Sequence, residues 1–331
     1  SLIVTPTREL AAQVRESVNT YSKYLSTKST AVYGGARIHN QRLKLRSGID
    51  ILVATPGRLL DLHNQKSVNL NNIEILVLDQ ADQMLDMGFI HDIKKIANLL
   101  PDRRQNLMFI ATFSDSFRSL AMNLAKKAIE ISVTNDNETG KNINHYIHPV
   151  DKSRKAELLI ELINTKKWEQ ALVFTRTKHG ADRLQKQLDN VNINSKAIHG
   201  NKTQNNRMKA LEAFKNNKIQ ILVATDVAAR GIDIKRMSQV INFDVPTVAK
   251  DYVHRIGRTG RGGNMGEAIT LVSADEFRLL RDIEKLINKK LERVEIQGFE
   301  PEHLAPVTDK PIKKRFHNKK GFNKRSKSRK G

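Results

Sequence analysis

Three arginines in a short, glycine-broken segment are the strongest chemical feature of this sequence. The run Val253-His254-Arg255-Ile256-Gly257-Arg258-Thr259-Gly260-Arg261 places Arg255, Arg258 and Arg261 three residues apart. Like charges at this spacing repel one another along a helix, so the arrangement is unfavourable without an anion. Guanidinium groups bind phosphate oxygens through paired hydrogen bonds. The segment therefore predicts a charge-stabilising clamp, and a solvated basic turn is the alternative.

Small hydroxyl residues, glycines and arginines recur directly after the apolar runs of the chain. Ligands of open parallel sheets bind beyond the carboxyl ends of the strands, and these residue types hold phosphate oxygens. In the first half they are Pro6 to Glu9, Gly34-Gly35, Thr55 to Arg58, Asp79 to Asp82 and Ala111-Thr112. In the second half they are Thr175 to Thr177, His199-Gly200, Thr225-Asp226, Arg230 to Asp233 and Asp244.

Asp79 is a candidate metal ligand. It follows an apolar run, where a carboxylate can hold Mg²⁺ through water beside the phosphates of a nucleotide. A helix cap is the alternative role for a single Asp after a strand.

The elements that must position these residues alternate along the chain. Short β-branched runs are separated by segments with apolar residues at helical spacing, such as 37–46 and 92–100. The expected strands are 2–5, 30–33, 50–54, 73–78 and 107–111, followed by 171–174, 195–198, 220–224, 239–243 and 268–272. Continuous apolar strands between helices indicate a parallel sheet covered on both faces. The expected fold class is α/β.

The two halves also repeat one another. Residues 51–55, Ile-Leu-Val-Ala-Thr, recur as residues 221–225, an offset of 170. The same offset relates Leu2, Thr5, Thr7 and Arg8 to Leu172, Thr175, Thr177 and Lys178. Residues 31–34 resemble 197–200 at an offset of 166. We interpret this as one α/β unit used twice, and chance similarity of apolar strands ending in Thr is the alternative.

The length of 331 residues suggests about two globular domains. Residues 135–142 are polar turn formers without periodicity, which indicates a linker. We expect a first domain over 1–134, a linker over 135–143, a second domain over 144–297 and a tail over 298–331.

Charge and composition restrict the class of protein. The chain has no cysteine, which excludes disulfides and thiolate metal sites. Its apolar runs are far shorter than the roughly 18 residues of a membrane helix, and its first residues lack the regions of a signal peptide. A cytoplasmic protein without membrane contact is therefore expected. Of the formal charge of +22, half lies in residues 310–331, which hold 11 Lys and Arg and no Asp or Glu. Such a tail is typical of disordered segments that meet nucleic acid, although a solubilising tail is the alternative.

Taken in order, these motifs resemble those of the DEAD-box RNA helicases of superfamily 2, which have two RecA-like domains. The matching segments of the first half are Pro6 to Ala11, Gly34-Gly35, Thr55 to Arg58, Asp79 to Asp82 and Ile110 to Thr112. Those of the second half are Val173 to Thr175, Gln204 with Arg207, Ala224 to Asp233 and His254 to Arg261. Residues 84–89 and the basic tail resemble the bacterial RhlE-type subgroup.

The resemblance implies an ATP site with Mg²⁺ between the domains. Asp79 would hold Mg²⁺, and Asp82 would bond to His254 and to the coupling motif formed by Ile110, Ala111 and Thr112. Gly231 and Asp233 would contact the nucleotide. Arg258 and Arg261 would reach its γ-phosphate only when the domains close.

The resemblance also implies an RNA site that crosses both domains. Contacts to phosphates and 2′-hydroxyls hold RNA without reading its sequence, so short duplexes would be unwound with low sequence specificity. The expected contacts are Thr7, Arg8, Gly35, Thr55, Arg58, Thr175, Arg176, Gly200, Gln204, Arg207 and Thr225.

Three features depart from the family pattern. The sequence contains no phosphate-binding loop of the form G-x-x-x-x-G-K-[ST], so we interpret it as an amino-terminally truncated chain whose incomplete first domain exposes a sheet edge. Gln80 stands where the family has a Glu, and an amide cannot take a proton from the attacking water. Ile110 replaces a Ser that would bond to Asp82. Impaired hydrolysis is therefore expected, and a non-catalytic RNA-binding clamp is the alternative function.

The charge of the tail gives the first testable prediction. Deletion of residues 310–331 removes 11 cationic side chains, so fewer counterions are released when RNA binds. We expect weaker RNA affinity and a shallower dependence of that affinity on salt concentration. An unchanged salt slope in titrations with a labelled RNA would show that the tail does not contact RNA.

Overall fold

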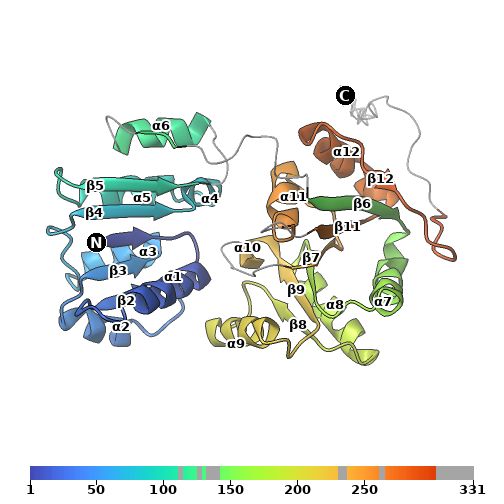
Figure 1. Cartoon of the computed structure of the whole chain (residues 1–331), viewed down its shortest axis with the longest axis horizontal. Coiled ribbons are helices and arrows are strands. Elements are labelled where there is room, and N and C mark those ends of the chain that lie inside the picture. Colours follow the sequence, from blue (N-terminus) through green and yellow to red (C-terminus); the bar gives the residue numbers. More distant parts are fainter. Residues whose placement is uncertain (111–114, 125–128, 132–141, 230–236, 261–264, 303–331) are drawn as a thin grey trace, which may run out of the picture.

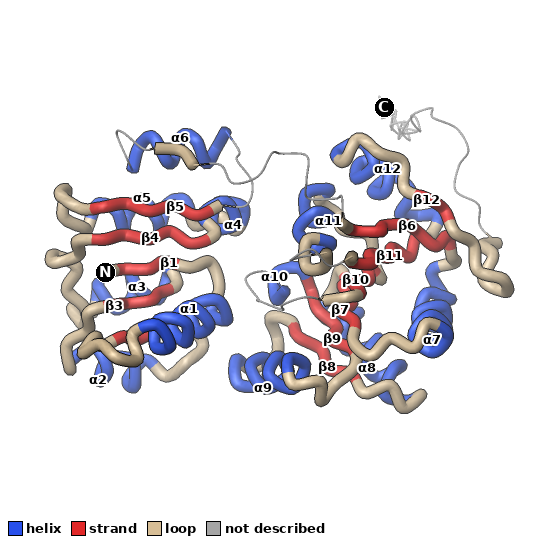
Figure 2. Tube along the Cα trace, in the orientation of Figure 1, coloured by secondary structure: helices blue, strands red, loops and turns tan. Residues whose placement is uncertain are grey.

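The computed structural model describes residues 1–110, 115–124, 129–131, 142–229, 237–260 and 265–302, which form two α/β lobes (Figure 1). Strands and helices alternate in both lobes, as the tube view shows (Figure 2). None of the helices within these residues is long and apolar enough to cross a membrane.

The first lobe has a parallel five-stranded sheet in the order β2-β3-β1-β4-β5. Its strands are β1 (Leu2–Val4), β2 (Ser29–Val32), β3 (Ile51–Ala54), β4 (Ile75–Asp79) and β5 (Gln105–Phe109). Its helices are α1 (Arg8–Tyr21), α2 (Ile38–Arg46), α3 (Pro56–Asn64), α4 (Ala81–Asp86), α5 (Ile90–Asn98) and α6 (Asp115–Leu124).

The second lobe has a parallel seven-stranded sheet in the order β12-β6-β11-β10-β7-β9-β8. Its strands are β6 (Ile143–Pro149), β7 (Ala171–Thr175), β8 (Ser195–Ile198), β9 (Ile221–Thr225), β10 (Gln239–Asn242), β11 (Gly266–Val272) and β12 (Glu292–Arg293). Its helices are α7 (Lys155–Thr165), α8 (Lys178–Asn190), α9 (Gln204–Lys215), α10 (Asp226–Ala229), α11 (Ala249–Ile256) and α12 (Phe277–Leu286), with short 3₁₀ helices η1 (Lys152–Arg154) and η2 (Ala274–Glu276).

The strand order confirms that one unit is used twice. The order β2-β3-β1-β4-β5 of the first lobe is repeated as β8-β9-β7-β10-β11 in the second. The register repeats as well, because Leu2 lies opposite Leu52 and Leu172 lies opposite Leu222. The two parallel sheets therefore present equivalent loops at their carboxyl edges.

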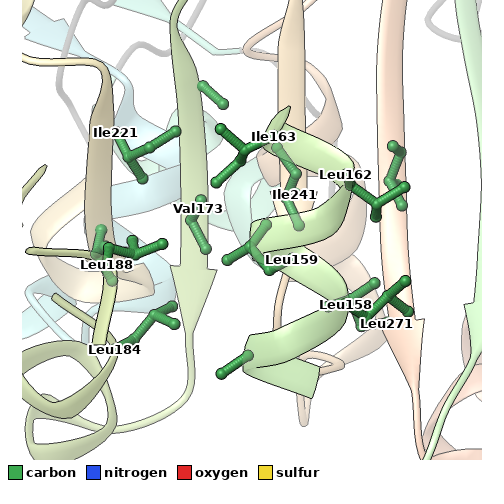
Figure 3. Close-up of a cluster of buried hydrophobic side chains, with 14 of the residues drawn as sticks. Leu158, Leu159, Leu162, Ile163, Val173, Leu184, Leu188, Ile221, Ile241 and Leu271 are labelled. Atoms are coloured by element: carbon green, nitrogen blue, oxygen red, sulfur yellow. The ribbon is translucent and has the colours of Figure 1, made fainter. Parts of the chain in front are cut away.

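Apolar side chains on both faces of the second sheet form its core. All residues of β7 and β9 are buried, as expected for strands covered by helices on both faces. Figure 3 shows one such face, on which Leu158, Leu159, Leu162 and Ile163 of α7 pack toward Val173 of β7. Leu184, Leu188, Ile221, Ile241 and Leu271 complete the labelled cluster.

Two strands of the second lobe were not expected from the sequence. β6 begins at Ile143, at the end of the expected linker, and β12 lies beside it. β6 contains His145, His148 and Pro149, so it lacks the continuous apolar run that identified the other strands. Val294, Ile296 and Phe299 pack against the core cluster, so the chain contacts this lobe beyond residue 297. The domain boundaries stay predictions.

β5 forms one edge of the first sheet, and the other edge is β2. Within the described residues, β5 pairs only with β4 and has no fully buried residue, and Phe109 is 55% exposed. Its counterpart β11 pairs with both β10 and β6 and is almost wholly buried. The difference follows from the neighbour that β6 supplies to β11.

The repeated helix caps give a stability prediction. Thr177 Oγ1 accepts a hydrogen bond from Gly180 N at 2.9 Å, and Thr7 Oγ1 accepts one from Leu10 N at 3.3 Å. Loss of such a cap costs about 1 kcal/mol. We expect Thr177→Ala to lower the unfolding free energy of the second lobe by about that amount, measured by the fluorescence of Trp168, the only tryptophan of the chain.

The matched control is Thr7→Ala, which removes the equivalent cap from the first lobe. The two lobes have separate sheets and apolar cores, so we expect them to unfold separately. Because Trp168 is buried in the second lobe, this variant should leave the unfolding transition reported by Trp168 in place. An equal shift in both variants would contradict separate unfolding of the lobes.

Candidate nucleotide and RNA interface

The turn after β4 places the acidic residues at the carboxyl edge of the first sheet. Asp79 ends β4, and Gln80 adopts a left-handed conformation with φ 55° before α4 begins. A non-glycine residue in this region stores about 1–3 kcal/mol of strain, a feature that clusters at functional sites. Asp82 is buried in the first turn of α4. Its expected bond with His254 stays a prediction.

Asp79 has the chemistry of a cation ligand. Burial raises the pKa of its carboxyl group above the usual value, with a smaller opposing effect of the Gln80 backbone N–H and a further increase from the charge of Asp82. A divalent cation would offset that desolvation and favour the ionised carboxylate. No cluster of three or more metal-ligating side chains occurs among the described residues.

The structure corrects the prediction that Arg255 belongs to an anion clamp. Its side chain is 2% exposed, and its Nε and Nη2 donate to the two carboxylate oxygens of Asp226 at 2.6 and 2.8 Å. Its Nη1 donates to Asn242 Oδ1 at 3.0 Å and to Asp244 O at 2.7 Å. The charge of Arg255 is therefore satisfied inside the second lobe, and the clamp prediction is restricted to Arg258 and Arg261.

Arg8 and the glycine loop after β2 form one unit at the edge of the first sheet. A Cβ atom on Gly35, which has φ +75°, would clash with Nη1 of Arg8. Arg58 Nη1 donates to Ala36 O at 3.3 Å and its Nε lies 3.4 Å from Asp61. Three predicted RNA contacts, Arg8, Gly35 and Arg58, are thus brought together.

The second lobe repeats this arrangement with a different cation. Lys178 Nζ donates to Asn201 Oδ1 at 2.8 Å, and a Cβ on Gly200 would lie 3.6 Å from Lys178 Cε. Lys178 stands at the position of Arg8 in the repeat, and sequence reasoning did not include it among the site residues. The offset of 170 residues was the signal that could have found it.

Two predicted RNA contacts of the second lobe have structural partners. Thr175 is fully buried and its hydroxyl donates to Thr177 O at 3.4 Å, so its side chain shapes the turn and does not reach the surface. The backbone N of Arg176 donates to Asp244 Oδ2 at 2.8 Å, and its Nη2 donates to Glu276 Oε1 at 2.7 Å. Glu276 was not anticipated.

Glu9 links the two lobes. Its carboxylate, on α1, accepts Gln204 Nε2 at 2.8 Å and Arg207 Nη2 at 3.0 Å, both from α9. Figure 1 shows α9 on the side of the second lobe that faces the first. Glu9 is 1% exposed, and burial lowers the pKa of Arg207 while the Glu9 charge raises it. In this arrangement Gln204 and Arg207, both predicted RNA contacts, bind a carboxylate that the sequence analysis had not assigned.

The remaining predicted residues are placed as follows. Thr7 and Thr55 are buried at the starts of α1 and α3, and Thr225 is buried at the end of β9. Ile110 packs against the apolar core of the first lobe. His254 and Arg258 are partly buried at the end of α11. Ala111, Thr112, Gly231, Asp233 and Arg261 lie outside the described residues.

The pairing of Asp226 with Arg255 can be tested by stability. Asp226→Ala leaves a buried guanidinium without its carboxylate, which typically costs about 3–5 kcal/mol. Denaturant unfolding followed by Trp168 fluorescence would measure it. Glu157→Ala is the control, because that carboxylate is 65% exposed and pairs with Arg154, which is itself 37% exposed, where a cost of about 0–1 kcal/mol is usual. Equal costs would contradict the assigned role of Asp226.

Comparison with known protein families gives two matches in this chain. Residues 1–120 match the DEAD/DEAH box helicase family, and residues 154–263 match the helicase conserved C-terminal domain.

Named relatives cover most of the chain. It is 38% identical to the ATP-dependent RNA helicase DbpA of Bacillus subtilis over 95% of this chain and 67% of DbpA. It is 39% identical to the DEAD-box ATP-dependent RNA helicase RhpA of Helicobacter pylori over 89% of this chain and 60% of RhpA. The chain thus spans about three fifths to two thirds of the length of these curated relatives.

Solved structures of two other proteins are similar to this chain in fold. Saccharomyces cerevisiae Dbp5 bound to RNA and ADP BeF3 matches with TM-score 0.79 and 31% identity over 89% of this chain and 77% of Dbp5. The DEAD-box helicase Mss116 bound to ssRNA and UDP-BeF matches with TM-score 0.79 and 28% identity over 90% of this chain and 65% of Mss116. The strand order and these similarities together show that the chain, with its two RecA-like lobes, belongs to the DEAD-box RNA helicase family.

Proposed function

We propose that this chain acts as an ATP-dependent RNA helicase that separates short RNA duplexes when its two lobes close on the RNA backbone. The observation that carries the proposal is the buried contact of Glu9 with Gln204 and Arg207, which joins the lobes directly beside Arg8. Closure and the gripping of RNA therefore involve neighbouring residues of α1. The similarity to Dbp5 bound to RNA and ADP BeF3 supports this arrangement.

Nucleotide would bind between the lobes. Asp79 would hold Mg²⁺, which neutralises charge on the phosphate oxygens, and Gly231 and Asp233 would contact the nucleotide. Arg258 and Arg261 would approach the γ-phosphate from the second lobe. Because Arg255 is anchored to Asp226, α11 can hold Arg258 in a fixed direction.

RNA would lie across the carboxyl edges of both sheets. In the first lobe Arg8, Gly35 and Arg58 would contact phosphates, and in the second lobe Arg176 and Gly200 would do so. Such contacts position the strand without reading bases. Sequence specificity would then be low, and 2′-hydroxyl contacts would favour RNA over DNA.

Gln80 favours the second candidate function, a clamp that binds RNA without hydrolysis. Its amide oxygen can accept a hydrogen bond from water but cannot take the proton. In this alternative the lobes would grip RNA and ATP turnover would be absent.

RNA-stimulated ATP turnover separates the two functions. We would compare this chain with a chimera that carries, before Ser1, the amino-terminal segment of the Bacillus subtilis relative, with and without Gln80→Glu. We expect the chimera with Gln80→Glu to turn over ATP most rapidly, because a carboxylate can accept the proton from water. Absence of turnover in every chain would reject the enzyme and leave the clamp.

Arg258→Ala in the same chimera is the control for the site. It should abolish turnover while RNA binding by the chain stays nearly unchanged, because a γ-phosphate contact acts on the transition state. Equal loss of turnover and RNA binding would indicate misfolding.

A further inference from the structure

The arginine loop, defined here as residues 257–260, rests on the first residues of β6. We propose that residues 142–145, where the chain joins the second sheet, position this loop and thereby set the direction of Arg258. The proposal rests on the proposed function for the role of Arg258, but the contacts that carry it are independent of ATP and RNA.

Gly260 is the closest point of contact. It has φ +67°, and a Cβ atom there would lie 2.6 Å from Ile143 Cγ1 and 3.0 Å from Asn142 O. Such distances leave no room for a side chain. Gly260 therefore lies directly on Asn142 and Ile143, two residues after Arg258.

The segment that returns from the loop lies on the same residues. Gly266 N donates to Asn142 O at 2.8 Å, and Gly266 is opposite Ile143 in the β6–β11 register. A Cβ on Gly266 would clash with Gly260 N and with Thr259. Both sides of the arginine loop are therefore packed against the start of β6.

The helix that leads into the loop has a third contact with this strand. His145 Nδ1 lies 3.1 Å from Tyr252 Oη, and the two rings stack with centroids 6.1 Å apart. Tyr252 is fully buried and also bonds to Thr270 of β11. Ile143, Tyr252 and Ile256 belong to one apolar cluster, so α11 cannot shift without disturbing β6.

Two glycines make the Gly-Arg-Thr-Gly segment conformationally permissive, but its contacts restrict the backbone on both sides of Arg258. Arg258 N donates to Arg255 O at 3.1 Å, and Thr259 N donates to Ile256 O at 3.0 Å. Thr259 also donates its hydroxyl to Ser238 O at 3.2 Å. Arg258 thus lies between a backbone bond to α11 and Gly260, which rests on β6, so movement of residues 142–145 would be transmitted to it.

Hydrogen exchange of the whole chain tests the proposal. Ile143→Ala removes the side chain beneath Gly260, and we expect the amides of residues 257–260 to exchange at least about tenfold faster relative to those of β7 and β9. Ile147→Ala is the matched control, because Ile147 lies on the same strand and in the same apolar cluster but about 13 Å further along it. Ile143→Val, which keeps the branched carbon, should restore most of the protection.

Equal acceleration of the loop by Ile143→Ala and Ile147→Ala, or no acceleration by either, would overturn the proposal. His145→Phe keeps an aromatic ring but removes the Nδ1 that contacts Tyr252, and it provides a second variant should Ile143→Ala unfold. It should also speed up the amide exchange of residues 257–260, and unchanged exchange of these amides would overturn the proposal. Since neither ligand is present, failure of the helicase function would leave this result unaffected.

A kinetic measurement on the chimera tests whether residues 142–145 affect catalysis through the arginine loop. Ile143→Ala should lower kcat of RNA-stimulated turnover at least about fivefold with little change in KM for ATP, as expected when only a transition-state contact is lost. Ile147→Ala should change neither. A rise in KM with unchanged kcat would show that residues 142–145 affect nucleotide binding and not the direction of Arg258.

Discussion

The structure depends most on a carboxylate shared between the lobes. Glu9 is almost completely buried, and its partners Gln204 and Arg207 come from the other lobe. A buried ionised carboxylate without partners is strongly unfavourable, so Glu9 is satisfied either by this contact or by water after separation. The net free energy of such a pair is small because desolvation opposes attraction, which suits a contact that would form and break as the lobes close and open in the proposed function.

Duplication of the fold explains why two such lobes can bind one ligand. Equal strand orders place equivalent loops at the carboxyl edge of each sheet. Arg8 lies over Gly35 in the first lobe, and Lys178 lies beside Gly200 in the second. A polymer with a repeating phosphate backbone fits two repeated cationic loops. The proposed RNA site is therefore a consequence of repetition.

Much of this arrangement could be predicted from the sequence, because continuous apolar runs identify strands that are buried on both faces. Ten strands were located in this way, and the repeat predicted that one α/β unit is used twice. β6 was not predicted because its two histidines and its proline interrupt the apolar run. The ion pair that buries Arg255 also could not be predicted, since its partner Asp226 is distant in sequence and only the folded lobe brings them together. Glu9 was visible within a recognised motif, but its partners lie on α9, and their contact depends on how the lobes meet.

In the proposed function, RNA binding and hydrolysis rest on different residues. Gln80 lies in a left-handed turn between β4 and α4, directly after Asp79. Its amide cannot accept the proton of the attacking water. The Glu9 contact lies elsewhere, on α1, and does not involve Gln80. In the proposed function, closure on RNA can then proceed while hydrolysis is slow, and the lobes would stay closed for longer. A chain with these residues would hold RNA as a clamp between infrequent turnovers, which joins the two candidate functions in one mechanism.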